Sequence, residues 1–131
     1  MREDSGVVWL ERMSLTHLKV RVRNPRDPRR YSDVEMLVDS GAIYAVLPAA
    51  LLRRLGIRPD GKERFTLADG SHVVRETGTA IFELDGRRRG SPVIFGRRGD
   101  ASLMGALTLE ALGLMLDPLK RRLRPLPMLL V

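Results

Sequence analysis

Apolar and charged residues alternate along much of this 131-residue chain. In the segment 15–23, apolar Leu18, Val20 and Val22 alternate with charged residues, which is the period-two pattern of a strand with one buried face. The same pattern and short apolar runs predict further strands at 34–38, 45–47, 65–68, 73–75, 80–84, 92–95 and 114–116. The chain is therefore predicted to be mainly β.

Turn signals separate these segments. Asp-Gly pairs stand at 60–61, 69–70 and 85–86. Such a pair between two strands favours a hairpin, because a type I′ turn needs positive φ at both central positions. The segment 24–30 contains two prolines and is predicted to be a loop. We therefore expect a series of antiparallel hairpins.

Two short helices are predicted between the strands. Pro48 suits a first helical turn, and the helical pattern 49–55 is followed by Gly56, a natural stop. A second helix is predicted at 108–112, again ended by a glycine. The length suits one domain. Residues 1–131 are therefore predicted to form a single small closed β-barrel or sandwich with two short helices.

The net charge changes this picture little. The chain has 23 Lys and Arg against 16 Asp and Glu, a formal charge of +7, with basic clusters at 21–30, 87–89 and 120–124. Such charge can attract acidic partners or nucleic acid. Turns separate the clusters, and no aromatic residues are interleaved to stack on bases. We therefore interpret the clusters as solvated faces and expect no nucleic-acid partner. An Arg-rich β domain that binds nucleic acid is kept as an alternative hypothesis, supported by charge alone.

Composition also excludes several kinds of site. The chain has no Cys, which removes disulfide scaffolds, thiolate metal sites and Cys nucleophiles. His17 and His72 are its only histidines, and no metal-ligand spacing surrounds them, so we expect no metal and no cofactor. The apolar run 101–116 is broken by Glu110, and the run 7–10 is too short for a signal peptide. We expect a cytoplasmic protein without a membrane segment.

The candidate chemistry lies where the apolar run 34–38 ends in Asp39-Ser40-Gly41-Ala42. A buried strand delivers one carboxylate into a tight turn at the edge of the core. The hydroxyl of Ser40 can lock such a turn by hydrogen bonding, and Gly41 lets another backbone segment approach closely. The pattern suits a catalytic carboxylate, and Asp39 is the candidate.

Several motifs in order carry a resemblance to a known family. Residues 38–42, Val-Asp-Ser-Gly-Ala, are similar to the active-site turn of the retropepsin-like (retroviral-type) single-domain aspartic proteases, in the prokaryotic branch of the pepsin clan. The segment 65–75 corresponds to the flap hairpin of that family, and 80–95 to the hairpin that follows. The second signature is matched by Leu103, Met104 and Gly105. The flap residues expected to bind substrate are Ala68, Asp69, Gly70, Ser71 and His72. The resemblance covers about residues 34–118.

The resemblance implies an aspartic endopeptidase that acts on extended polypeptides. Two carboxylates must face one water, and close like charges share a proton and titrate as a unit. This chain has one such motif, so a complete site needs Asp39 from each of two copies, and a homodimer is expected. Ser40, Gly41 and Ala42 are expected to support the turn, Ser40 by a hydrogen bond across the twofold axis. Met104 and Gly105 are expected to brace it from beneath.

The sequence departs from the family pattern at three points. Ser40 replaces the commoner threonine, the flap tip has one glycine, and bulky Ile43 and Tyr44 follow the motif. These departures motivate the second hypothesis, a dimeric module of the same fold that binds peptides or proteins without cleaving them. Tyr44 and Trp9 are expected to pack, with a cleft or dimer surface as the alternative. Whether residues 1–24 and 125–131 pair at the dimer interface is left open.

Overall fold

The computed structural model describes residues 17–117, 122–127 and 130. Trp9, most of the terminal segments and part of the basic cluster 120–124 lie outside these residues, and so do the interpretations made of them. The strands are β1 His17–Asn24, β2 Asp27–Val38, β3 Ala45–Pro48, β4 Gly61–Thr66, β5 His72–Leu84, β6 Arg87–Gly96, β7 Leu103–Met104, β8 Leu114–Asp117 and β9 Arg122–Pro125. The helices are α1 Ala49–Arg54 and α2 Ala106–Ala111.

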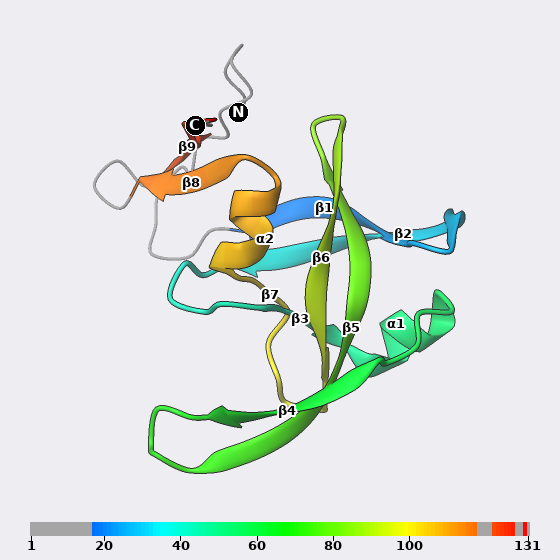
Figure 1. The fold of residues 1–131 in the computed structure, drawn as a ribbon, viewed down its shortest axis with the longest axis vertical. Coiled ribbons are helices and arrows are strands. Elements are labelled where there is room, and N and C mark those ends of the chain that lie inside the picture. The colour runs from blue at the N-terminus through cyan, green and yellow to red at the C-terminus, as the bar shows by residue number, and fades with distance from the viewer. Residues whose placement is uncertain (1–16, 118–121, 128–129, 131) are drawn as a thin grey trace.

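Seven of the strands form one sheet that closes on itself. Its order is β1-β2-β7-β3-β6-β5-β4, and β1 pairs with β5 as well as with β2. Six strands therefore make a ring, with β4 attached outside it along β5, while β8 and β9 pair separately (Figure 1). The predicted mainly β barrel with two short helices is confirmed.

Alternation along the strands builds the core. Leu18, Val20 and Val22 of β1 are buried, while the charged Lys19 between them is exposed, as the period-two pattern predicts. The core is completed from the other strands and from both helices by Met36, Val38, Ala45, Leu47, Leu51, Leu52, Leu55, Ile57, Ala80, Phe82, Val93, Phe95, Met104, Leu109, Leu112, Leu114 and Leu123. A single apolar core therefore fills the barrel and reaches under α1 and α2.

The first hairpin differs from the prediction. The expected loop 24–30 is only a two-residue turn, and β2 already begins at Asp27. The pairing shifts at this end, from Arg23 opposite Tyr31 to Asn24 opposite Asp27, so the segment with Pro28 bulges out of the ladder, where a missing N–H is tolerated. The buried Asn24 side chain accepts from the Arg26 N–H at 2.8 Å and donates to the carbonyl of Leu55 at 2.9 Å.

The Asp-Gly pairs have different fates. Asp85 and Gly86 have φ of 52° and 82° and form the predicted turn between β5 and β6. The pair at 69–70 lies at the turn between β4 and β5, also as predicted. The expectation for 60–61 is wrong. The Asp60 N–H donates to the carbonyl of Thr77 at 2.8 Å, so this pair begins β4 in an existing ladder instead of turning between two strands.

The helices follow the local signals closely. Pro48 is the last residue of β3 and the N-cap position of α1, one residue before the helical turn predicted for it, whereas Gly56 with φ of 82° ends the turn after the helix as predicted. Helix α2 starts two residues earlier than expected, at Ala106. Its Thr108 is fully buried and shares a hydroxyl hydrogen bond of 2.9 Å with buried Ser91 on β6, which fixes α2 against the barrel. No described helix is long and apolar enough to cross a membrane.

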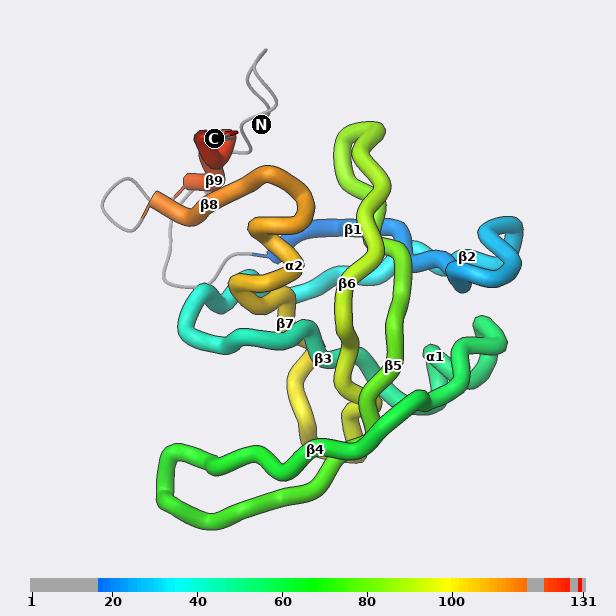
Figure 2. The backbone as a smooth tube through the Cα atoms, viewed as in Figure 1, coloured from blue at the N-terminus to red at the C-terminus, as the bar shows by residue number. Residues whose placement is uncertain are grey.

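One hairpin leaves the barrel. From His72 to Glu76, strand β5 pairs with β4 alone, and only from Thr77 onward does it also pair with β6. We call this ribbon, residues 61–76, the arm. It reaches away from the barrel at the lower left of Figure 1, and the tube of Figure 2 shows its turn as the far end. The arm and the end of β2 frame the site described next.

Candidate active site

The turn after β2 orients the Asp39 carboxylate. The Ala42 N–H donates to the Asp39 carbonyl at 3.1 Å, which closes the turn. The Gly41 N–H donates to Oδ1 of Asp39 at 2.9 Å. A Cβ at Gly41 would lie 3.2 Å from that same oxygen, so glycine leaves room for the carboxylate. Asp39 is half-buried and Ser40 is exposed, which leaves the acid at the surface of the barrel end.

Strand β7 supports this turn from the neighbouring position in the sheet. It lies between β2 and β3 and runs parallel to β2, with Val38 opposite Met104. The Asp39 N–H donates to the carbonyl of Met104 at 3.0 Å, and the Leu37 N–H donates to the carbonyl of Ser102 at 3.0 Å. The backbone of Asp39 is therefore fixed directly by the second predicted signature.

Gly105 lets the chain after β7 pass very close to the turn. A Cβ there would lie 2.6 Å from the carbonyl oxygen of Ile43 and 2.7 Å from that of Tyr44, a clash with backbone that no rotamer relieves. The next two amides close the contact, since Ala106 N–H donates to the carbonyl of Ala42 at 2.8 Å and Leu107 N–H to that of Ile43 at 3.0 Å. The structure thus brings together Asp39, Gly41, Ala42, Met104 and Gly105.

The predicted flap residues lie at the end of the arm. The Leu67 N–H donates to the carbonyl of Ser71 at 2.8 Å, and Gly70 has φ of 87°. Oδ1 of Asp69 accepts from the N–H and hydroxyl of Ser71 at 2.9 and 2.6 Å, and the Ser71 hydroxyl lowers the pKa of Asp69. Nδ1 of His72 lies 3.1 Å from the Thr66 hydroxyl. Ala68 through His72 are all exposed, and in the described residues no hydrogen bond joins them to Asp39.

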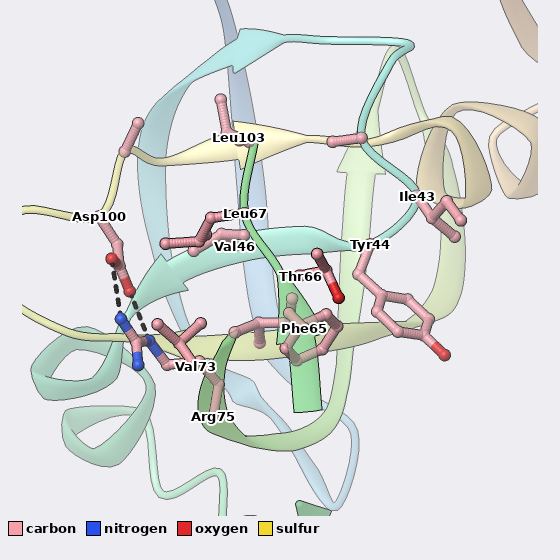
Figure 3. A pocket seen from close by; sticks show the side chains of 13 residues that line it. Ile43, Tyr44, Val46, Phe65, Thr66, Leu67, Val73, Arg75, Asp100 and Leu103 are labelled. Carbon is pink, nitrogen blue, oxygen red and sulfur yellow. Dashed lines mark hydrogen bonds and ion pairs between the residues drawn. The ribbon is translucent and has the colours of Figure 1, made fainter. Parts of the chain in front are cut away.

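A pocket of about 500 Å³ lies between the arm and the turn (Figure 3). Most of its lining is apolar, and it receives residues from the turn, the barrel, the arm and the loop before β7: Ala42, Ile43, Tyr44, Val46, Phe65, Thr66, Leu67, Val73, Arg75, Ile94, Asp100, Ala101 and Leu103. The rings of Tyr44 and Phe65 meet edge to face at 5.9 Å and join the turn to the arm. The pocket therefore presents an apolar surface that begins at Ala42, three residues after the candidate acid, and Asp39 itself does not line it.

An ion pair forms another part of the wall. Nε and Nη2 of Arg75 donate to Oδ2 and Oδ1 of Asp100 at 2.9 and 3.2 Å, as the dashed lines of Figure 3 show. Hydrogen bonding from Arg75 is the main cause that holds the pKa of Asp100 below its ordinary value. The pair is therefore ionised and bidentate. It links the arm, through Arg75, to the loop before β7, through Asp100.

Ala42, Leu103 and the hairpin 65–75 were expected at the site, but no pocket was predicted between them, and Val46, Ile94 and Asp100 were not expected there. The alternation around the turn at 69–70 carried a usable signal for Phe65 and Val73, because both lie on the same face of the arm. Arg75 and Asp100 carried none, since they are 25 residues apart in a chain rich in arginine. Tyr44 was expected to pack, and it does so against Phe65 at the pocket.

Asp39 has too few polar neighbours in one chain to carry out hydrolysis alone. In the described residues its carboxylate has one hydrogen-bond partner, the Gly41 N–H, and no group of three His, Asp or Glu is placed to hold a metal ion. A lone carboxylate in water-accessible surroundings can accept one proton. It cannot at the same time donate one, which hydrolysis of an amide requires.

Comparisons with known proteins agree with this geometry. A family model described as aspartyl protease matches residues 18–111. Among solved structures, the EIAV protease in complex with an inhibitor has a TM-score of 0.61 at 21% identity, covering 82% of this chain and 95% of that one.

Two further structures are similar. A retropepsin-like aspartic protease from Rickettsia conorii has a TM-score of 0.57 at 19% identity, covering 89% of this chain and 86% of its own. The protease of simian foamy virus (mac) has a TM-score of 0.52 at 18% identity, with coverages of 72% and 91%. No curated protein matches the chain. At these identities the structures establish the fold.

Proposed function

The chain belongs to the aspartyl protease family, and we propose that it cleaves peptide bonds as a homodimer in which each copy supplies one Asp39 carboxylate. The match to the aspartyl protease family supports the expected aspartic-type peptidase, and the similar structures confirm the expected retropepsin-like fold. The observation that carries the dimer proposal is that one chain supplies only one of the two carboxylates that the reaction needs. One well-supported carboxylate stands at the surface, with only a backbone N–H as its partner in the described residues.

Two such carboxylates supply what one lacks. Facing each other across a twofold axis, they share a proton, because two close negative charges are costly. The ionised Asp39 takes a proton from water as the water oxygen bonds to the scissile carbon, and the protonated Asp39 donates to the carbonyl oxygen. The first Asp39, now protonated, then gives its proton to the amide nitrogen as the C–N bond breaks, and the second takes a hydroxyl proton as the new carboxyl group forms. The backbone bonds to Met104 and Gly41 hold each acid in place during these transfers.

The pocket and the arm support a polypeptide substrate. The apolar wall formed by Ile43, Tyr44, Phe65 and Leu103 suits an apolar side chain near the scissile bond. Strand β4 is the last strand of the sheet order, so its outer edge is available for pairing with an extended backbone. We therefore propose extended polypeptides with apolar side chains as substrates.

The distribution of charge argues against a nucleic-acid partner. Several arginines pair with carboxylates on neighbouring elements, among them Arg21 with Asp33, Arg23 with Glu83 and Arg53 with Glu76. Their charge is partly neutralised within the protein, which weakens the attraction for phosphates. This supports the interpretation of the basic clusters as solvated faces.

The first experiment compares wild type with Asp39→Asn on an unfolded protein, across pH 3 to 8, with products resolved by mass spectrometry. We expect cleavage by wild type and none by Asp39→Asn, while sedimentation finds dimers in both. Asp60→Asn is the matched control, because Asp60 does not line the pocket and its backbone N–H, which pairs with Thr77, is kept in the variant. Binding of the substrate without cleavage at every pH would support the non-cleaving module instead.

Mixing the two proteins tests whether sites are shared. If each site needs Asp39 from both copies, then random exchange of equal amounts of wild type and Asp39→Asn leaves about one quarter of the dimers active. Activity that instead falls to one half would mean that each chain works alone, and would overturn the shared site.

A further inference from the structure

The arm depends on a few contacts for its position. A two-stranded ribbon is marginally stable alone, and within the part of the chain that the structure describes no further strand pairs with residues 61–66 or 72–76. Among the described residues, one ring contact and two ion pairs connect its side chains to the rest of the molecule. Tyr44 meets Phe65 on the pocket side, Arg53 binds Glu76 at 2.7 Å, and Arg75 binds Asp100. The geometry of these contacts determines where the arm lies over the pocket.

Of the two ion pairs, Arg75–Asp100 has the more tightly defined geometry. It is bidentate, and its side chains are 16% and 28% exposed, whereas Arg53 and Glu76 make one bond at 50% and 37%. Bidentate arginine–carboxylate pairs fix orientation as well as distance. The guanidinium of Arg75 cannot be replaced by an ammonium without losing this fork.

Asp100 is itself held in place by its loop. The Arg97 N–H donates to Oδ2 of Asp100 at 2.8 Å, and the Asp100 N–H donates to the carbonyl of Arg97 at 2.8 Å. Between them Gly99 has φ of 93°, a conformation that glycine adopts without strain. The carboxylate that receives Arg75 is therefore already oriented by a tight turn.

The loop leads directly to the acid. Two residues after Asp100, the carbonyl of Ser102 accepts from the N–H of Leu37, and that of Met104 accepts from the N–H of Asp39. The Arg75–Asp100 ion pair therefore connects the arm to the Asp100 turn, and the chain through β7 with its two backbone hydrogen bonds connects that turn to the active-site turn. Displacing Asp100 would move the wall of the pocket at Leu103 as well.

We propose that the Arg75–Asp100 pair is a latch that positions the arm over the pocket and thereby determines how tightly an extended peptide is held. The proposal rests on the function proposed above. Arg75 is a positioning residue, since it acts through the arm and the pocket wall, and the chemistry stays with Asp39. Loss of the latch therefore raises KM and leaves kcat nearly unchanged, as expected when binding is lost equally from the ground state and the transition state.

The test compares Arg75→Lys and Asp100→Asn with Arg21→Lys in the full chain. Arg21 is the matched control because it binds Asp33 through the same pairs of atom types, at 2.8 and 3.3 Å, on the barrel wall between β1 and β2. The substrate is a peptide that contains one of the bonds that wild type cleaves in the unfolded protein. We expect about a tenfold rise in KM for both latch variants, kcat within about twofold, and no change for Arg21→Lys.

Hydrogen exchange provides a readout that does not depend on cleavage. Amides of the arm are expected to exchange about fivefold faster in Arg75→Lys than in Arg21→Lys, while amides of β1 and β2 stay protected. The double variant Arg75→Lys/Asp100→Asn is expected to behave like either single variant, because both remove the same contact.

The outcomes separate the latch from the function. Equal KM and equal arm exchange in Arg75→Lys and Arg21→Lys would overturn the latch, and so would a fall in kcat at constant KM. Cleavage by Asp39→Asn would overturn the proposed function while arm exchange still tests the latch. If Arg75→Lys does not fold, Asp100→Asn answers the same question, since the Asp100 N–H bond to Arg97 is unaffected.

Discussion

The barrel and the arm are both built from β-strands, in a mixed sheet and in an antiparallel ribbon respectively, but they are held in place by different forces. The barrel is a ring filled with buried apolar side chains such as Phe82, Met36 and Leu47. The arm buries none of its residues fully, and the side-chain contacts that join it to other described elements are one aromatic contact and two ion pairs. Burial of apolar side chains contributes most of the free energy of folding and does not depend on direction. Exposed ion pairs contribute little to stability, but they require a particular geometry. We therefore expect barrel changes to alter stability and arm changes to alter substrate binding.

The largest difference is expected from truncation of an apolar side chain in each region. Phe82 on β5 is fully buried in the barrel, so Phe82→Ala is expected to lower the free energy of unfolding by about 3–5 kcal/mol. Val74 lies in the arm portion of the same strand and is 49% exposed, so Val74→Ala is expected to change it by less than about 0.5 kcal/mol. Urea denaturation measures both, and equal losses would mean that the arm folds as part of the core.

A smaller loss is expected where barrel and active-site turn meet. A Cβ at residue 105 would lie 2.6 Å from the Ile43 carbonyl oxygen, so Gly105→Ala is expected to cost about 1–3 kcal/mol and to reduce cleavage by displacing the turn. Gly90→Ala on β6 is the control, since its Cβ would meet only Thr79 at 4.0 Å. Thermal unfolding and cleavage rates check both, and full activity in Gly105→Ala would contradict the bracing role of this residue.

The smallest effect concerns an ion pair at the seam of the ring, which is the pairing of β1 with β5 that closes it. Nε of Arg23 on β1 donates to Glu83 on β5 at 2.7 Å, and this bond is the main cause that lowers the pKa of Glu83 from its usual 4.5. A lowered carboxylate pKa stabilises the fold above the unfolded value, and the stabilisation is lost as the pH falls through the folded value. Glu83→Gln is therefore expected to be less stable than wild type at neutral pH, with the difference shrinking below about pH 4.5.

Denaturation midpoints between pH 7 and pH 3 measure this convergence. Cleavage kinetics at neutral pH are expected to stay at the wild-type values, because Glu83 lies on the barrel seam and not on the pocket wall. Parallel stability curves for wild type and Glu83→Gln over the whole range would contradict the assignment.

Sequence reasoning succeeded where the signal was local. The alternation in β1, the turn at Asp85-Gly86 and the stop at Gly56 each depend on a few neighbouring residues, and each appears as predicted. It failed where a distant partner decided. The pair at 60–61 became the start of β4 because Thr77 was available to its backbone, and the segment with Pro28 joined β2 through a bulge.

The candidate site divides in the same way. Asp39, Gly41, Met104 and Gly105 were found because motifs fix them in sequence, and the structure joins them through short backbone contacts. Their roles in catalysis, and the roles of Ser40 and of the flap residues 68–72, remain predictions. The Arg75–Asp100 pair had no local signal, because an ion pair across 25 residues exists only once the arm is in place.

The closed ring has a consequence for how the chain folds. The seam joins Arg21 and Arg23 of β1 to residues of β5, and Arg23 and Glu83 are 60 residues apart in sequence. During synthesis the β1–β2 hairpin leaves the ribosome long before β5 exists to cover its open side. Completion of the ring must therefore wait for a long-range encounter, and a topology of this kind folds on the slow side for its size.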